Sequence, residues 1–261
     1  YFYSCLLSDT LKMKEYRYNG GFDMYNFDQE PERRHLVDEA GLNSFLSKIY
    51  GYMALAVFVS ALSAYLTMTV FASQMMSLMV HHPWTMWLLL LIPIVLTFAI
   101  NFQATRNPVA SFILLMITAI VYGVTFAFIA GTYTGQDIAS AFIASATVFV
   151  VMAILGTVTK KDLSRWGSYA SAALIGLIVA MLINMFLKSS AANYIFSFIA
   201  VIIFTVLTAW DAQRMKNIYL QFGGELPTNG LAIVGALQLY LDFVNLFLQF
   251  LTIFGSNDNN N

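Results

Sequence analysis

Residues 235–255 read GALQLYLDFVNLFLQFLTIFG, an apolar run that contains an acid, Asp242. A helix rises about 1.5 Å per residue and a hydrocarbon core is roughly 30 Å thick, so this run and the few residues before it are enough for one crossing. Gln238, Asn245 and Gln249 share a stripe of this helix with the acid, since they follow at helical spacings. Unpaired polar groups cost several kcal/mol in lipid. The stripe is therefore predicted to face the interior of a bundle or water.

The composition places the whole chain in the membrane class. It is 59% hydrophobic and 10% charged over 261 residues, whereas soluble domains are about 45–50% apolar and about 25% charged. The basic residues form no patch with interleaved aromatics, so no nucleic-acid binding is expected. The single cysteine, Cys5, cannot form an internal disulfide, and the histidines fall outside the apolar runs, so neither a metal site nor a cofactor is predicted. The histidines are His35, His81 and His82.

The hydrophobic layout predicts three parts. Residues 1–44 are polar, hold eight of the fourteen acids and are expected to form a cytoplasmic N-terminal tail. Residues 45–255 are expected to form an all-α integral membrane domain of seven transmembrane helices, and residues 256–261 a short polar tail. The seven apolar runs, each near the length of one crossing, are 48–72, 86–104, 109–131, 138–159, 167–187, 193–213 and 229–254.

Local signals predict details of these helices. Pro93 lies inside the second run and should kink it. Asn107 and Pro108 are predicted to be the cap and first residue of the third helix. Asp137 stands beside a Gly-containing turn and is interpreted as a helix cap.

Twelve of the thirteen basic residues fall on the side of the membrane that holds the N-terminus. This bias predicts that the N-terminus and the loops after the second, fourth and sixth spans are cytoplasmic. The protein is accordingly expected in the inner (plasma) membrane of a cell, or in an organelle membrane if it is eukaryotic. The twelve are Lys12, Lys14, Arg17, Arg33, Arg34, Lys48, Arg106, Lys160, Lys161, Arg165, Arg214 and Lys216; the exception is Lys188.

Two acids lie within the apolar runs, and their partners are open from the sequence. Asp211 ends the sixth run three residues before Arg214, and it can be an interfacial acid paired with that arginine. Placing an ionised Asp at mid-membrane costs about 2.5–3.5 kcal/mol. Asp242 therefore needs a polar side chain, a water-lined path or the other acid. Two neighbouring carboxyls in low dielectric tend to share one proton and titrate as a unit, which would make a pH sensor.

Depth within the membrane bears on whether the two acids meet. Asp211 lies near the inner end of its predicted span, whereas Asp242 is about 13 residues, or roughly 19 Å, past the start of its own. Helix tilt, an extended sixth helix that reaches Tyr219, or a later start of the seventh helix would each bring them to one level.

Three segments resemble the signature segments of the Bax inhibitor-1 family in its bacterial form. They read LGTVTKKDLS at 155–164, TAWDAQRMK at 208–216 and GALQLYLDFVNLF at 235–247. The hydrophobic layout of residues 45–255 resembles the family as well. The resemblance implies a seven-helix bundle in which two three-helix layers surround a central C-terminal helix.

The same resemblance implies a function. It predicts a pH-sensitive calcium leak governed by a buried aspartyl pair, carried here by Asp211 and Asp242. Gln238, Asn245 and Gln249 are the candidate pore-lining residues, and Arg106, at the cytoplasmic end of the second span, is the candidate latch. Calcium suits the oxygen-rich side chains of the stripe, because hard cations prefer oxygen ligands.

Two other functional classes compete with a cation leak. The bundle can be a regulator that binds another membrane protein, such as a membrane protease or a cell-death factor; flux in protein-only liposomes separates this hypothesis from a leak. An intramembrane aspartyl protease would use both carboxyls as acid and base. Asp242 follows Leu-Tyr-Leu rather than the Gly-x-Gly of those enzymes, and neither GxSxG nor HExxH occurs, so no enzyme is expected.

Overall fold

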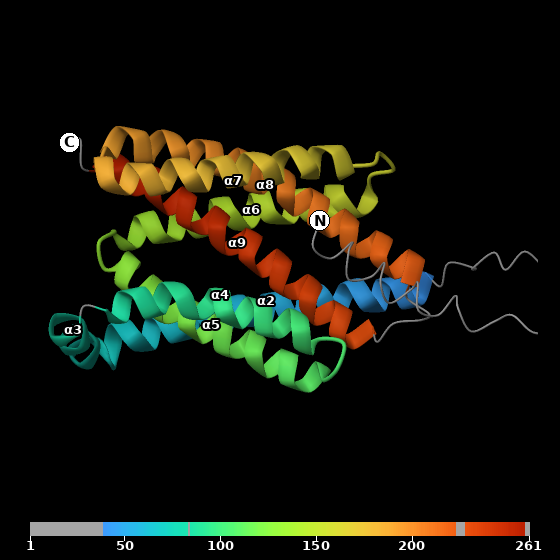
Figure 1. The fold of residues 1–261 in the computed structure, drawn as a ribbon, viewed down its shortest axis with the longest axis horizontal. Helices are drawn as coiled ribbons and strands as arrows, with labels where there is room; N and C mark the ends of the chain where they lie inside the picture. The colour runs from blue at the N-terminus through green and yellow to red at the C-terminus, as the bar shows by residue number, and fades with distance from the viewer. Residues whose placement is uncertain (1–38, 83, 223–227, 259–261) are drawn as a thin grey trace, which may run out of the picture. The chain divides into compact units, whose positions relative to one another are not determined.

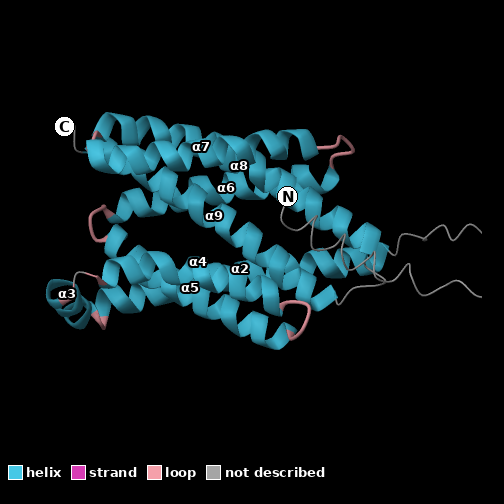
Figure 2. Ribbon diagram, in the orientation of Figure 1, coloured by secondary structure: helices cyan, strands magenta, loops and turns pink. Residues whose placement is uncertain are grey.

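The computed structural model describes residues 39–82, 84–222 and 228–258, which lie within one compact unit, Asp38–Asn261. These residues are helical apart from short turns, and no strand occurs among them (Figures 1 and 2). Residues 1–38 of the predicted N-terminal tail, and residues 259–261, lie outside the described part. The helices are α2 (Glu39–Thr69), α3 (Ala72–His81), α4 (Thr85–Gln103), α5 (Pro108–Ala130), α6 (Gly135–Val158), α7 (Ser164–Leu187), α8 (Ser190–Phe222) and α9 (Thr228–Asp258).

Six helices, α2 and α5 to α9, are long and apolar enough to cross a membrane. The chain is therefore an all-helical membrane protein with several spans. The predicted second span, 86–104, corresponds to α4, an apolar helix of 19 residues that is not among these six, so the count of seven stays a prediction. No sequence pattern predicted α3, because its ten residues are too few for a crossing.

The helices pack in two groups that both contact α9. In the first group α5 packs against α2 and α4; in the second α8 packs against α6 and α7. Helix α9 packs against α2, α6 and α8, and Figure 1 shows it crossing between the groups. Of the most apolar stretch of α9, 67% is buried, against 17–50% in the other spans. The helix with the polar stripe is thus also the one most removed from lipid.

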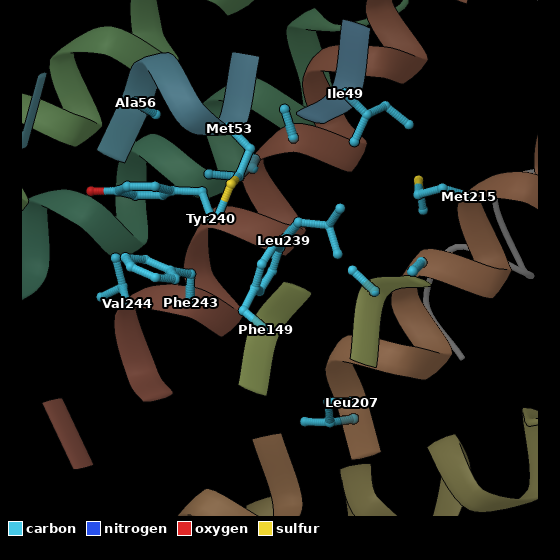
Figure 3. Close-up of a cluster of buried hydrophobic side chains, with 14 of the residues drawn as sticks. Ile49, Met53, Ala56, Phe149, Leu207, Met215, Leu239, Tyr240, Phe243 and Val244 are labelled. Carbon is cyan, nitrogen blue, oxygen red and sulfur yellow. The ribbon is translucent and has the colours of Figure 1, made fainter. Parts of the chain in front are cut away.

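An apolar and aromatic cluster fixes α9 in place. Figure 3 shows Leu239, Tyr240 and Phe243 of α9 among buried side chains from α2, α6 and α8. The Tyr240 hydroxyl lies 2.7 Å from Ser60 Oγ on α2, so the phenol oxygen is satisfied although its side chain is fully buried. This face of α9 is ordinary core, and it sets the direction in which the polar stripe points.

The helix caps predicted from local signals are confirmed, and the kink at Pro93 stays a prediction. Asn107 caps α5, and its side chain accepts a hydrogen bond from the Ala110 N–H, with Pro108 as the first helical residue. Asp137 completes a capping box with Thr134 at the start of α6. Pro93 lies inside α4. These helix ends need no tertiary partner, which is why a single sequence locates them.

Gly156 provides a test of helix packing. A Cβ at Gly156 on α6 would collide with the carbonyl oxygen of Ala209 on α8, whereas a Cβ at Gly176 on α7 would meet no heavy atom within 4 Å. Gly156→Ala should therefore destabilise the protein by about 1–3 kcal/mol, the usual cost of overpacking. Gly176→Ala, the matched control, should be neutral or stabilising by up to about 1 kcal/mol. Thermal unfolding in detergent measures both, and equal melting temperatures would contradict the close α6–α8 contact.

Candidate functional site

Helices α8 and α9 form an antiparallel pair that carries one acid each. The two helices pack against each other and run in opposite directions. Asp211 lies eleven residues before the end of α8 at Phe222, and Asp242 fourteen residues after the start of α9 at Thr228. At about 1.5 Å per residue these offsets differ by only roughly 5 Å. Of the three ways to level the acids, the structure shows the extended sixth helix, which passes Tyr219.

The structure brings the two carboxyl groups together. Asp211 and Asp242 are 8% and 5% exposed, and their side chains form a hydrogen bond with each other. A hydrogen bond between two carboxyls requires that one of them carries a proton to donate. The remaining oxygens, Oδ1 of Asp211 and Oδ2 of Asp242, are buried and have no partner among the described residues.

A cavity of about 420 Å³ lies beside the pair, between α7, α8 and α9. Its volume has room for on the order of ten water molecules. The predicted pore-lining residues Gln238, Asn245 and Gln249 all line it, so the whole α9 stripe faces this space. The rest of the wall is largely apolar and comes from α7 and α8: Leu174, Leu177, Ile178, Met181, Phe204 and Leu207.

The amides of the stripe differ in how they are satisfied. The Asn245 side-chain amide donates to the Leu241 carbonyl oxygen at 2.8 Å. Gln238 Oε1 is buried without a partner in the part of the chain that the structure describes. An unpaired buried acceptor costs about 1–3 kcal/mol, and three such oxygens lie around one cavity: this amide oxygen and one oxygen of each acid. These oxygens would bind a water or a cation only after a local rearrangement, because water does not reach them in this structure.

Arg214 is the one charged residue besides the two acids that lines this cavity, as far as the chain is described. It attracts Asp211 electrostatically, and its guanidinium carbon lies 5.3 Å from the centre of the Trp210 ring. Asp211 thus interacts with both partners that the sequence left open, electrostatically with the arginine and through a hydrogen bond with the other acid. It is too buried to be an exposed interfacial acid.

The comparison with known proteins decides the family. Over residues 42–259 the sequence matches the family described as "Inhibitor of apoptosis-promoting Bax1". The chain belongs to the Bax inhibitor-1 family.

Relatives of this Bax inhibitor-1 protein are similar over nearly their whole length. An uncharacterized membrane protein of Streptococcus pyogenes serotype M3 is 39% identical over 220 residues, 84% of this chain and 96% of the relative. The inner membrane protein YbhL of Escherichia coli strain K12 is 34% identical over 233 residues, 88% of this chain and 99% of YbhL. Their names agree with a membrane protein built on this helical domain.

The role of Arg106 as a latch stays a prediction. Arg106 is exposed in the turn between α4 and α5 and does not line the described cavity. Arg214 instead lies beside Asp211. The sequence signal that could have identified Arg214 is its spacing from Trp210, which places an aromatic ring and a cation one helical turn apart.

A polar contact that no sequence pattern predicted fixes the loop before α7 on α8. The side-chain amide of Gln213 donates to the Lys161 carbonyl oxygen and accepts from the Leu163 N–H, both at 2.8 Å. Next to it, Asp162 accepts hydrogen bonds from the Ser164 hydroxyl and N–H, which hold the pKa of Asp162 below its usual value. The loop before α7 is thereby attached to the helix that carries Asp211.

Cysteine labelling tests whether this family's α9 stripe faces water. In a Cys5→Ser background, single cysteines replacing Gln238, Asn245 or Gln249 should react with small thiol reagents, because these positions line the cavity. Cysteines at Leu239 and Leu246 should not react, since these residues are 1% and 0% exposed in the core. Equal labelling of the two sets would indicate that the stripe serves ordinary helix packing and does not face water.

Proposed function

We propose that this Bax inhibitor-1 protein is a pH-sensitive cation leak, with calcium as the permeating ion, governed by the Asp211–Asp242 pair. The observation that carries the proposal is the hydrogen bond between two buried carboxyls on the wall of a cavity that the polar stripe of α9 lines on one side. The protonation of the pair sets two things at once. It sets the charge that faces the cavity, and it sets whether a hydrogen bond joins α8 to α9.

The chemistry of the cavity supports a cation as the transported species. Two carboxyls and three side-chain amides supply oxygens to it, and hard cations such as calcium prefer oxygen ligands. Calcium itself is named from the family. We propose that the protein is no enzyme and uses no cofactor, so the acids would act as a sensor rather than as an acid–base pair.

We also propose the finer architecture that the family implies. In it α4 also crosses the membrane, which brings the number of spans to seven. One layer consists of α2, α4 and α5, the other of α6, α7 and α8, and the two layers surround α9. The packing groups support this arrangement. The N-terminus would be cytoplasmic and the protein would reside in the inner membrane of a bacterium. The basic-residue bias and the relative called an inner membrane protein support that placement.

Topology can be tested with fused reporters. The orientation predicts that a tag inserted after Lys161 is protected in intact cells and that a tag after Lys188 is labelled from outside. The two sites flank α7, so they act as mutual controls. A tag at Lys161 that reacts from outside would reverse the model of orientation.

Neutral substitutions test the sensor. Asp→Asn keeps the shape of the side chain but replaces the titrating acid with an amide, so calcium flux in protein-only liposomes should lose most of its pH dependence in both Asp211→Asn and Asp242→Asn. Because the two groups act as one unit, the double variant should lose little more than either single one. Flux measured between about pH 5 and pH 8 compares the four proteins.

Asp137→Asn is the matched control, since Asp137 caps α6 away from the cavity; its pH profile should match the wild type. An unchanged profile in Asp242→Asn would remove the sensor. If purified wild-type protein gave no flux in any condition, the result would favour the alternative function, a regulator that acts by binding another membrane protein.

A further inference from the structure

A second, smaller cavity of about 260 Å³ lies near the start of α7, and we call it the vestibule. Its polar lining comes from Ser164, Gln213, Asn217 and Gln221, with Ile218 beside them. Trp210 and Arg214 line both the vestibule and the acid-pair cavity. These two side chains therefore form the wall between the two spaces.

The wall is held from both sides. Gly167 on α7 leaves room for the Trp210 indole, because a Cβ at that position would collide with the ring. The guanidinium carbon of Arg214 lies 5.3 Å from the ring centre, within the range of cation–π contacts. Asp211 attracts the same guanidinium. A positive charge is thus fixed between a rigid ring and the acid pair.

We propose that Trp210 and Arg214 form the selectivity barrier between the vestibule and the acid-pair cavity, and that Arg214 is the charge a cation must pass. The inference rests on the proposed function, because it assigns a role within the same cation path. The acids would draw cations into the cavity, and the guanidinium would limit the rate at which they enter.

The physical basis is the field of one charge at a position lined by protein. Salt screens buried and partly buried charges much less than exposed ones. A cation in the wall would lie within a few ångströms of the guanidinium, where repulsion is strong at protein dielectric values. A neutral solute of equal size would meet the same ring but no repulsion. The barrier therefore discriminates by charge more than by size.

A purely structural role for Arg214, in which it only pairs with Asp211, predicts a different labelling result. Removing the arginine would then loosen the α8–α9 region and admit cationic and neutral solutes alike. Lysine in its place keeps the charge but loses the planar stacking on the indole. The charge of the solute thus separates a barrier from a structural contact.

The test is thiol labelling of a cysteine at Gln238, inside the acid-pair cavity, in a Cys5→Ser background. Sealed vesicles that expose the Lys160–Lys161 loop receive either a cationic or a neutral methanethiosulfonate reagent of similar size. Arg214→Gln should raise the labelling rate of the cationic reagent about tenfold relative to the neutral one. Arg214→Lys should leave that ratio near the wild-type value.

Two controls accompany the test. A cysteine at Gln221, in the vestibule and about two helical turns from Arg214, should show a much smaller change of the cationic-to-neutral ratio in Arg214→Gln than the cysteine at Gln238, because it lies before the barrier. Arg165→Gln removes an exposed charge near the same end of α7 without touching either cavity, and it should not change the ratio. Trp210→Leu should instead raise the rates of both reagents at Gln238→Cys, since the ring blocks every solute.

An unchanged cationic-to-neutral ratio in Arg214→Gln would overturn the barrier, as would equal acceleration of both reagents or no labelling at Gln238→Cys. The labelling does not require calcium flux or a pH response, so its outcome is independent of the sensor test. A shifted ratio with an unchanged pH profile in Asp242→Asn would support the barrier and reject the sensor. An unchanged ratio with a flattened pH profile in Asp242→Asn would support the sensor and reject the barrier.

Discussion

The rest of the structure depends on burying two carboxyl groups in a helical membrane domain. A carboxylate at the bilayer centre costs several kcal/mol unless it is paired or hydrated. The hydrogen bond between Asp211 and Asp242 gives each acid a partner, and their remaining oxygens are buried next to the cavity without a partner among the described residues. Both conditions require α9 to lie inside the bundle, and α9 is the most buried of the spans.

Opposite faces of α9 have different roles. On one face Tyr240 and its neighbours pack into the core and fix the rotation of the helix, with the phenol oxygen satisfied by Ser60. The other face turns Gln238, Asp242 and the following amides to the cavity. A helix that was polar on all sides could not be packed, and one that was apolar on all sides would offer no site.

Local features of the sequence predicted much of this structure. The caps at Asn107 and Asp137 and the polar stripe around Asp242 follow from spacing along one helix. The partner of Asp242 could not be read in the same way, because it depends on the length of α8 and on how two helices pack. The apolar pattern fades after Asp211, yet α8 continues to Phe222 on a mixed, partly buried surface. The position of Arg214 against Trp210 depends on the absence of a side chain at Gly167, which is a contact between helices.

The central claim is that Asp211 and Asp242 share one proton. Infrared difference spectroscopy of the carboxyl C=O band through a pH titration tests it most directly, since it observes the proton rather than flux. The account predicts that the wild type has a titrating carboxyl band whose frequency and midpoint both change when either acid is replaced by Asn. A band that keeps its frequency and midpoint in Asp211→Asn would show that Asp242 holds its proton alone, and would contradict the account.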